Sequence, residues 1–470
     1  MRMTSKVWQW VVVLGLLAGM GLWGGVHRAD SPSAVRPEHA EGPAPTPPMG
    51  WNSYDCYSGD VTEQEVKANA DYLAEHLARF GWKYVVVDYY WYFPHPRWTE
   101  DQEKWEVTMD EYGRLLPALN RFPSAAHGQG FKPLADYVHS KGLKFGIHIM
   151  RGIPRAAVVK NLPILGAPAH AKDVADTAND CSWSTAMHGV DVSKPAGQAY
   201  YDSIVALYAA WGVDFIKADD MSRGDKPAAR EDYHGAETAA LSHAIRKAGR
   251  PIVLSLSPGE TPLGEAAHVA KYAQMWRISD DFWDDWKLVK HQFLLCRAWA
   301  PYVGPNHWPD ADMLPLGRLR IREFDEPERQ SRLTPAEQQT HLTLWVIFRS
   351  PLMMGGDLPS LDAATLARLT NPEVLAVDQH SAHNRELFTH GNQVAWTADV
   401  PGSPDKYLAV FNLDDRAPAE VSVRWSELGL QGKCAVRDLW QKKDLGVIEG
   451  AFAPQIEGHG AGLYRIKPAP

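Results

Sequence analysis

The residues best suited to chemistry lie at the end of one short apolar segment. Residues 211–220 read as a glycine turn, a buried strand and then a lysine followed by two aspartates. Because side chains alternate between the faces of a strand, Lys217 and Asp219 point the same way and can share one pocket. The lysine would keep Asp219 ionised, as a nucleophilic carboxylate requires. The same pattern is also compatible with a surface ion pair at a strand end.

A second group of carboxylates lies further along the chain. Residues 275–286 place four aspartates between aromatic residues, with Arg277 and Asp281 on the same face of an extended segment. We expect the flanking rings to desolvate Asp281 in part, which would raise its pKa and suit a general acid. The start of a helix is an alternative that explains Asp284 and Asp285 well, but Asp281 less well. Two carboxylates on different strands of one barrel are the minimum machinery of a glycoside hydrolase.

The elements that would position these residues alternate along the chain. Strands are predicted at 49–55, 82–91, 143–150, 211–220, 251–257, 275–282 and 351–357. Helices are predicted at 62–80, 131–140, 195–211, 234–248, 284–298, 335–348 and 360–369, with 92–129, 153–190 and the Asp310–Asp312 region left as loops. This alternation over residues 45–385 predicts a (β/α)₈ TIM barrel, whose strand ends carry the active site.

The last part of the chain has a different pattern. Residues 386–470 hold short strands between Gly, Asp and Pro turns, which predicts a small antiparallel β-sandwich. At the other end, residues 1–30 combine a basic start with an uncharged run from Val11 to Val26. That pattern predicts a signal peptide or an uncleaved N-terminal anchor, and so an exported protein, secreted or periplasmic. Residues 31–44 read as a Pro/Ala-rich linker.

Composition narrows the class of protein. The chain has 470 residues with 45% hydrophobic content, enough for a large core, and its net charge of −9 does not suggest nucleic-acid binding. The 19 Trp and 17 Tyr favour sugar stacking only slightly, because Trp also fills cores. The four cysteines show neither metal-ligand spacing nor a dense disulfide framework, and the 19 His include no HExxH motif. We therefore predict no metal and no cofactor.

Several motifs together resemble the α-galactosidases of glycoside hydrolase family 27, in clan D. They are Pro47-Pro-Met-Gly-Trp-Asn-Ser53, the strand ending at Asp88, Lys217-Ala-Asp219, Trp276-Arg277 with Asp281 and Trp286, and Asp310-Ala-Asp312-Met-Leu. The resemblance runs in order from residue 45 to the end of the chain and includes the C-terminal sandwich.

The resemblance implies a retaining, two-step hydrolase that removes terminal α-D-galactosyl residues from oligosaccharides or polysaccharides. Asp219 matches the family's nucleophile and Asp281 matches its acid/base residue. The substrate-binding residues would be Trp51, as part of the floor, with Asp88, Tyr89, Lys217 and Arg277. The two catalytic carboxyls should lie about 5–5.5 Å apart, as retaining enzymes require.

The chain departs from the family pattern at positions that bear on the sugar. The family usually has two consecutive aspartates at the second strand tip, but Tyr89 takes the second position, so a carboxylate expected to bind the galactose 4- and 6-hydroxyls is missing. Losing such a hydrogen bond weakens recognition by roughly 1.5–3 kcal/mol. His148, which we interpret as structural, stands where a tyrosine is usual, and Ser257-Pro-Gly replaces the loop that reads the 2-position. Tyr90 and Met221 occupy positions often held by cysteines of a disulfide.

Two other functions stay open on these residues. The first is the same machinery acting on another sugar, as an isomalto-dextranase or a β-L-arabinopyranosidase, which Tyr89 and the Ser257 loop favour. The second is a non-catalytic carbohydrate-binding protein. Arguing against the second is the joint presence of Asp219, Asp281, Lys217 and Arg277, because a drifting site would tend to lose a carboxylate first. In every case the expected partner is a carbohydrate.

Overall fold

The structure is a computed structural model that describes residues 42–96, 106–181, 184–222, 233–257, 259–322 and 326–469. The predicted export segment, residues 1–30, and the linker up to residue 41 lie outside these ranges. Within the ranges, no helix combines the length and the apolar character that crossing a membrane would require.

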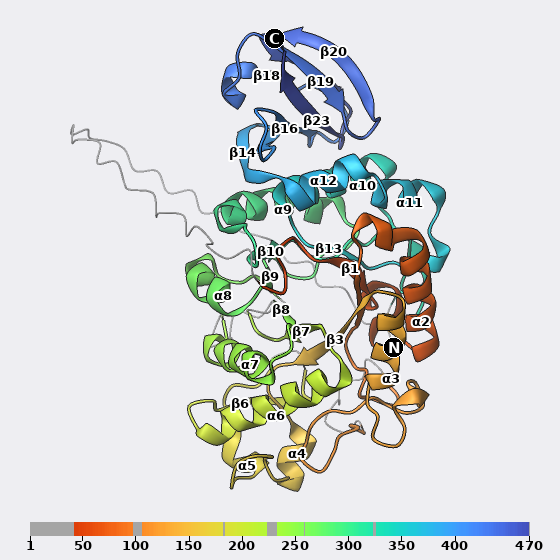
Figure 1. Cartoon of the computed structure of the whole chain (residues 1–470), viewed down its shortest axis with the longest axis vertical. Helices are drawn as coiled ribbons and strands as arrows, with labels where there is room; N and C mark the ends of the chain where they lie inside the picture. Colours follow the sequence, from red (N-terminus) through yellow and green to blue (C-terminus); the bar gives the residue numbers. More distant parts are fainter. Residues whose placement is uncertain are drawn as a thin grey trace, which may run out of the picture. The chain divides into compact units, whose positions relative to one another are not determined.

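Eight parallel strands form the central sheet (Figure 1). They are β1 (Met49–Asn52), β2 (Tyr84–Val87), β3 (Lys144–Met150), β7 (Phe215–Asp219), β8 (Val253–Leu256), β9 (Met275–Arg277), β10 (Trp308–Asp310) and β13 (Leu352–Met354). Their order is β10-β9-β8-β7-β3-β2-β1-β13, and a parallel bridge from Leu314, just after β10, to Met354 joins the two edges. The predicted barrel is therefore confirmed.

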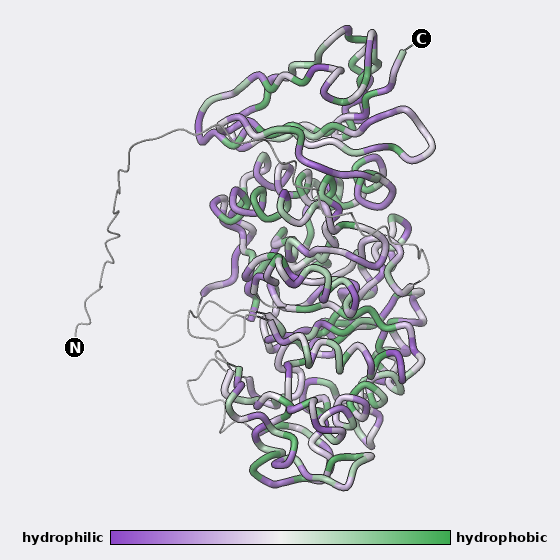
Figure 2. Tube along the Cα trace, turned by 90° about the vertical axis from the view of Figure 1, so that its left-hand side faces the viewer, coloured by the Kyte–Doolittle hydropathy of each residue, from purple (hydrophilic) through white to green (hydrophobic). Residues whose placement is uncertain are grey.

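Helices follow the strands and surround the sheet. They are α1 (Tyr54–Tyr57), α2 (Glu63–Tyr72), α3 (Lys132–Ser140), α6 (Pro195–Trp211), α7 (Gly235–Ala248), α8 (Ala266–Tyr272), α9 (Trp286–Trp299), α10 (Pro335–Phe348), α11 (Ala363–Leu369) and α12 (Pro372–His380). Along them the trace alternates between hydrophobic and hydrophilic residues (Figure 2), as expected for helices with one face on the barrel.

Local sequence explains where the best-predicted helices begin and end. The helix α6 begins at Pro195, whose fixed φ suits a first turn, and ends before Gly212, which has a φ of +89°. The helix α10 begins with a capping box in which Thr334 accepts from the Glu337 backbone N–H and Glu337 accepts from that of Thr334. Both helices have the predicted bounds.

Segments predicted as loops contain short elements. The 153–190 insertion holds β4 (Ile153–Pro154), α4 (Arg155–Lys160), α5 (Ala171–Val174), β5 (Ala175–Asp176) and β6 (Met187–Val190), with the three strands in the order β4-β6-β5. A small hairpin, β11 (Arg318–Leu319) with β12 (Arg329–Gln330), follows β10. The prediction of a loop at Asp310 was wrong, because Trp308, Pro309 and Asp310 form the barrel strand β10.

The C-terminal part is an antiparallel β domain, as predicted. Its six-stranded sheet contains β14 (Ala382–His390), β15 (Gln393–Asp399), β16 (Lys406–Asn412), β23 (Ala461–Pro468), β19 (Lys433–Asp438) and β20 (Lys443–Glu449), in that order. Two strand pairs accompany it, β17 (Ala419–Glu420) with β22 (Gln455–Ile456), and β18 (Val423–Arg424) with β21 (Ala451–Phe452). Side chains of the sheet and of these pairs, among them Val410, Val423 and Ile466, share one core.

Candidate active site

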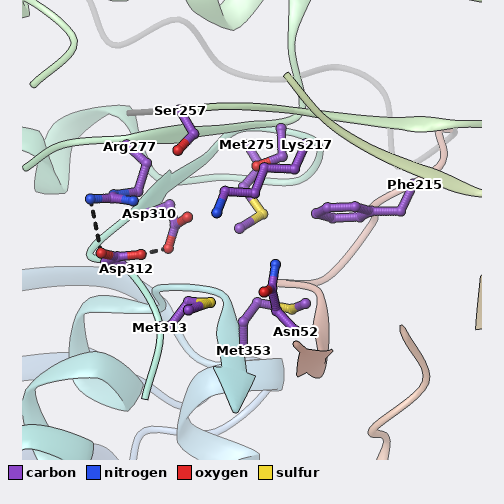
Figure 3. Close-up of a pocket in the computed structure, with 11 residues that line it drawn as sticks. Asn52, Phe215, Lys217, Ser257, Met275, Arg277, Asp310, Asp312, Met313 and Met353 are labelled. Carbon is purple, nitrogen blue, oxygen red and sulfur yellow. Dashed lines mark hydrogen bonds and ion pairs between the residues drawn. The ribbon is translucent and has the colours of Figure 1, made fainter. Parts of the chain in front are cut away.

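The interior of the barrel contains a pocket below the strand ends. Its lining residues are Asn52, Phe215, Lys217, Ser255, Ser257, Met275, Arg277, Asp310, Asp312, Met313 and Met353. Phe215 and the three methionines supply apolar surface, whereas Lys217, Arg277 and the two aspartates supply charge (Figure 3). The pocket therefore passes from an apolar floor to a charged rim.

The predicted nucleophile, Asp219, ends the strand β7 and is only 8% exposed. The backbone N–H of Asp220 donates to its Oδ1 at 2.9 Å, and the imidazole Nε2 of His148 lies 2.8 Å from its Oδ2. Both carboxylate oxygens are thus in contact with a polar group of a strand end. This arrangement leaves the carboxylate little rotational freedom.

Lys217 lies one strand repeat below Asp219 and contacts a carboxylate on another strand. Its Nζ is 3.0 Å from Oδ2 of Asp88, which follows β2, and the same oxygen accepts from Asn52 Nδ2 at 2.5 Å. Burial alone would raise the pKa of Asp88, but Lys217 and these hydrogen bonds lower it to about 2. Burial would likewise lower the pKa of Lys217, yet Asp88 and Asp219 raise it. Asp88 and Lys217 therefore form a charged pair.

The predicted acid/base residue, Asp281, lies in the loop that follows β9. Arg277, at the end of β9, contacts Asp281 Oδ1 at 3.1 Å and Asp312 Oδ2 at 2.8 Å through Nη2. Asp312 Oδ2 also accepts from the backbone N–H of Phe282 at 2.7 Å. Asp312 thus holds both the arginine and the backbone next to Asp281.

One expectation about Asp281 was wrong. The flanking rings were expected to desolvate its carboxyl in part, but the Asp281 side chain is 61% exposed. The strand β9 ends at Arg277, so the residues after it leave the barrel wall, and Phe282 turns into the core while Asp281 faces solvent. The Asp281 carboxyl is therefore accessible to solvent.

Asp310 and Asp312 form a second carboxyl pair, on β10 and just after it. The backbone N–H of Asp312 donates to Asp310 Oδ1 at 2.9 Å, and both side chains are buried. Burial raises the pKa of Asp310, and the Asp312 carboxylate raises it further, while Arg277 lowers it. Burial also raises the pKa of Asp312, against the lowering effect of Arg277. In the folded protein the pKa of each of these carboxyls therefore lies above its ordinary value.

The predicted floor residue, Trp51, has no surface to offer a sugar in this structure. It is 0% exposed, and its indole N–H donates to the backbone oxygen of Gly356 at 3.0 Å, so it belongs to the core. The ring next to the charged pair is that of Tyr54, which lies 5.9 Å from Lys217 Nζ and is only partly buried. The two residues are three positions apart in the same motif.

Tyr89 directly follows Asp88 and fills space at the side of the site. Its ring stacks on Tyr90 with centroids 3.4 Å apart and meets the ring of His148 edge-on at 5.0 Å. It is 3% exposed. The chain therefore places a large, buried aromatic ring directly after Asp88 and against the histidine that contacts the predicted nucleophile.

Sequence reasoning missed two residues that contact the predicted catalytic groups. His148, interpreted as structural, lies against Asp219, and the β3–β7 register that brings the two together is a tertiary feature without a local signal in the sequence. Asp312 was assigned to a loop, although its spacing of two from Asp310 was the signal for a shared site. Among the described residues, no cluster of His, Cys, Asp and Glu has the arrangement of a metal site. No disulfide joins the four buried cysteines.

Comparison with known proteins identifies the family. The family model described as Alpha galactosidase A matches residues 46–161 and 183–380, and the one described as Alpha galactosidase C-terminal beta sandwich domain matches residues 390–466. Alpha-galactosidase 3 of Arabidopsis thaliana is 30% identical over 438 residues, covering 91% of this chain and 83% of the plant protein.

Solved structures agree with this assignment. A family-27 β-L-arabinopyranosidase from Geobacillus stearothermophilus is 49% identical with a TM-score of 0.86, covering 90% of this chain and 97% of that one. Alpha-galactosidase I from Mortierella vinacea, at 23% identity and a TM-score of 0.67, shares the fold, covering 90% of this chain and 97% of that one. The chain belongs to the α-galactosidase family of glycoside hydrolases, family 27.

Proposed function

We propose that this glycoside hydrolase removes terminal α-D-galactosyl residues with retention of configuration, and that the same site accepts β-L-arabinopyranosides. The observation that carries the proposal is the pair of carboxylates, Asp219 at the end of β7 and Asp281 in the loop after β9, of which the first is held on both oxygens and the second is open to solvent. Such a pair suits a nucleophile and a proton donor, respectively.

The proposed mechanism has two steps. Asp219 attacks the anomeric carbon while Asp281 protonates the departing glycosidic oxygen, which leaves a glycosyl ester on Asp219. Asp281, now ionised, then takes a proton from water, and that water releases the sugar and restores Asp219. The Arg277 guanidinium, 3.1 Å from Asp281, can stabilise the ionised form that the second step requires.

The charged pair of Asp88 and Lys217 supports the proposal that a polar sugar ring binds at these strand ends. Neutral sugar hydroxyls both donate and accept hydrogen bonds, and the pair offers one carboxylate and one ammonium group 3.0 Å apart. Their mutual attraction holds the two side chains in place before the sugar binds. Binding therefore costs little side-chain entropy at these two residues.

Tyr89 favours β-L-arabinopyranosides as the better substrates. An α-D-galactopyranoside and a β-L-arabinopyranoside share their configuration at the ring carbons, but only the former carries a hydroxymethyl group at C5. A carboxylate at position 89 was expected to bind that group, and the chain has a buried ring there instead. The pentoside has no hydroxymethyl group, so it needs neither a carboxylate at position 89 nor the space that this group would occupy. The 49% identity to the Geobacillus β-L-arabinopyranosidase supports the same choice.

The test is a direct comparison of two aryl glycosides that differ only in the C5 substituent. We expect a higher kcat/KM for aryl β-L-arabinopyranoside than for aryl α-D-galactopyranoside, using protein that lacks residues 1–30. In Tyr89→Asp the ratio should shift toward the galactoside, whereas Tyr54→Phe should leave it unchanged. A clear preference for the galactoside would reject the role given to Tyr89, and turnover of neither glycoside would reject the proposed function and direct attention to dextran.

We also propose that the protein is exported. The support is the basic, then uncharged, N-terminal segment of residues 1–30. Detection of the protein, in its natural host, outside the cytoplasm would support the proposal, and purely cytoplasmic protein would contradict it.

A further inference from the structure

We propose that His148 is a positioning residue that holds the nucleophile in place as a neutral hydrogen-bond donor. The inference rests on the proposed function, in which Asp219 is the nucleophile. His148 lies on β3, in register with Lys217 of β7, and it is 0% exposed. Its Nε2 lies 2.8 Å from Asp219 Oδ2, which is the distance of a direct hydrogen bond.

The hydrogen-bond pattern defines the tautomer. An ionised Asp219 can only accept, so the ring nitrogen beside it must carry the hydrogen, which places that hydrogen on Nε2. The other nitrogen, Nδ1, is buried and has no hydrogen-bond partner within the described residues. A second N–H there would be a buried donor without an acceptor, which is costly. The surroundings of His148 therefore favour the neutral ring with a bare Nδ1.

A neutral donor suits a nucleophile better than a cation does. An imidazolium would form an ion pair with Asp219 and so lower the reactivity of the carboxylate. A neutral N–H fixes the orientation of the carboxylate and favours its ionised form at smaller cost to its reactivity. The backbone N–H of Asp220 acts on the other oxygen, so the two donors together orient the carboxylate.

The nearby groups are consistent with this role. The charged groups around the imidazole are Asp219 and Lys217 on β7 and Asp88 after β2, and the last two already form a pair with each other. The Tyr89 ring meets the imidazole edge-on at 5.0 Å and limits its rotation. His148 is thus fixed by packing on one side and by the nucleophile on the other.

Two substitutions separate positioning from packing. His148→Gln keeps an N–H donor near the position of Nε2, whereas His148→Phe keeps a ring and removes the donor. We expect His148→Phe to lower kcat/KM by about 10- to 100-fold, the range expected for loss of a hydrogen bond to a charged group. The acidic limb of its kcat/KM profile should move to higher pH, because a donor that favours ionised Asp219 is gone. His148→Gln should recover most of the rate with its acidic limb near that of the wild type.

His139 provides a matched control. It makes the same kind of contact, with its Nε2 2.8 Å from Asp214 Oδ2, at the opposite end of β7. His139→Phe should lower the melting temperature without moving the pH profile. Equal rates for His148→Phe and His148→Gln in folded protein, or an unmoved acidic limb in His148→Phe, would overturn the proposal. Wild-type turnover of the aryl glycosides, measured in the same series, reports on the proposed function separately.

Discussion

The ends of β7 and β9 carry the two predicted catalytic carboxylates in opposite surroundings. At the end of β7, Asp219 is 8% exposed and contacts His148 and the Asp220 backbone. In the loop after β9, the Asp281 side chain is 61% exposed, and its one ion-pair or hydrogen-bond contact within the described part of the chain is with the Arg277 guanidinium. The two strands are separated by β8 alone, so the difference arises locally.

This difference matches the two chemical tasks. A nucleophile must meet one atom, the anomeric carbon, along one line of approach, and every loss of orientation lowers the rate. An acid/base residue must first reach a departing oxygen and later a water molecule. We infer that the barrel holds one carboxylate by direct contacts and holds the other indirectly, through Asp312.

The largest effect should come from removing the nucleophile. Asp219→Ala should lower kcat by about 10⁴-fold or more with the fold intact, because no other carboxylate of the site has its two contacts. The measurement is turnover of an aryl glycoside, with circular dichroism as a check on folding. Added azide should restore part of the rate and give a glycosyl azide of inverted configuration. Wild-type-like activity in Asp219→Ala would refute the assignment.

The acid/base residue should show a loss that depends on the leaving group. Asp281→Ala should slow substrates with poor leaving groups by about 10²- to 10⁴-fold, but activated aryl glycosides much less, because those need little protonation. The test is kcat/KM across aryl glycosides of graded leaving-group pKa. Equal losses over the whole series would count against the acid/base role of Asp281.

Asp312 should affect the acid/base residue Asp281, after β9, and not the nucleophile Asp219 on β7. Asp312→Asn keeps the shape of the side chain but removes its charge, which weakens its contacts to Arg277 and to the Phe282 backbone. We expect a loss of about 10- to 100-fold that grows as the leaving group becomes poorer, as in a weaker Asp281 variant. His148→Phe should instead show no such dependence on the leaving group. If the two variants gave the same dependence, the division of the site into two sides would be wrong.

The smallest effects concern the stability of the fold, and ionisation of Asp88 and ionisation of Asp310 change it in opposite directions. The pKa of Asp88 is lowered to about 2, so its ionised form stabilises the fold above about pH 4, and this contribution is lost as the pH falls toward 2. The pKa of Asp310 is raised by burial and by Asp312, so its ionisation destabilises the fold as the pH rises above 4.

The corresponding measurement is the melting temperature of two isosteric variants against pH. Asp88→Asn should melt below the wild type between pH 5 and 8, with the gap closing below pH 4. Asp310→Asn should melt above the wild type at pH 8, and this gain should shrink as the pH falls toward 4. A gain of the same size at both ends of the range would show that the Asp310 charge is not its cause.

The fold was predictable wherever local signals were strong. The helix α6 has a proline at its start, a glycine after its end and an apolar stripe between them, and its predicted bounds are the observed ones. The strand β10 was missed because it is three residues long and contains Pro309, which argues against a strand on local grounds. Its pairing with β9 is a tertiary effect. The helix α12 was not predicted; Asn371 and Pro372 form its cap and first residue.

The sequence predicted which residue types form the candidate site, but it predicted their contacts and their exposure less well. Asp219 and Lys217 follow from strand alternation, and the pocket does place Lys217 inside the barrel. The exposure of Asp281 depends on where β9 ends, which no periodicity reveals. The choice between Trp51 and Tyr54 depends on which ring turns toward Lys217. The contact between His148 and Asp219 joins two strands that are 71 positions apart in sequence.

Trapping the covalent intermediate would test the central assignment most directly. A fluorinated glycosyl fluoride forms a glycosyl-enzyme that hydrolyses slowly, and peptide mass spectrometry then locates the ester. We predict one sugar per protein chain, attached to the peptide that contains the end of β7, with the label on Asp219. A label on another residue, or rapid turnover with inverted product and no label, would contradict it.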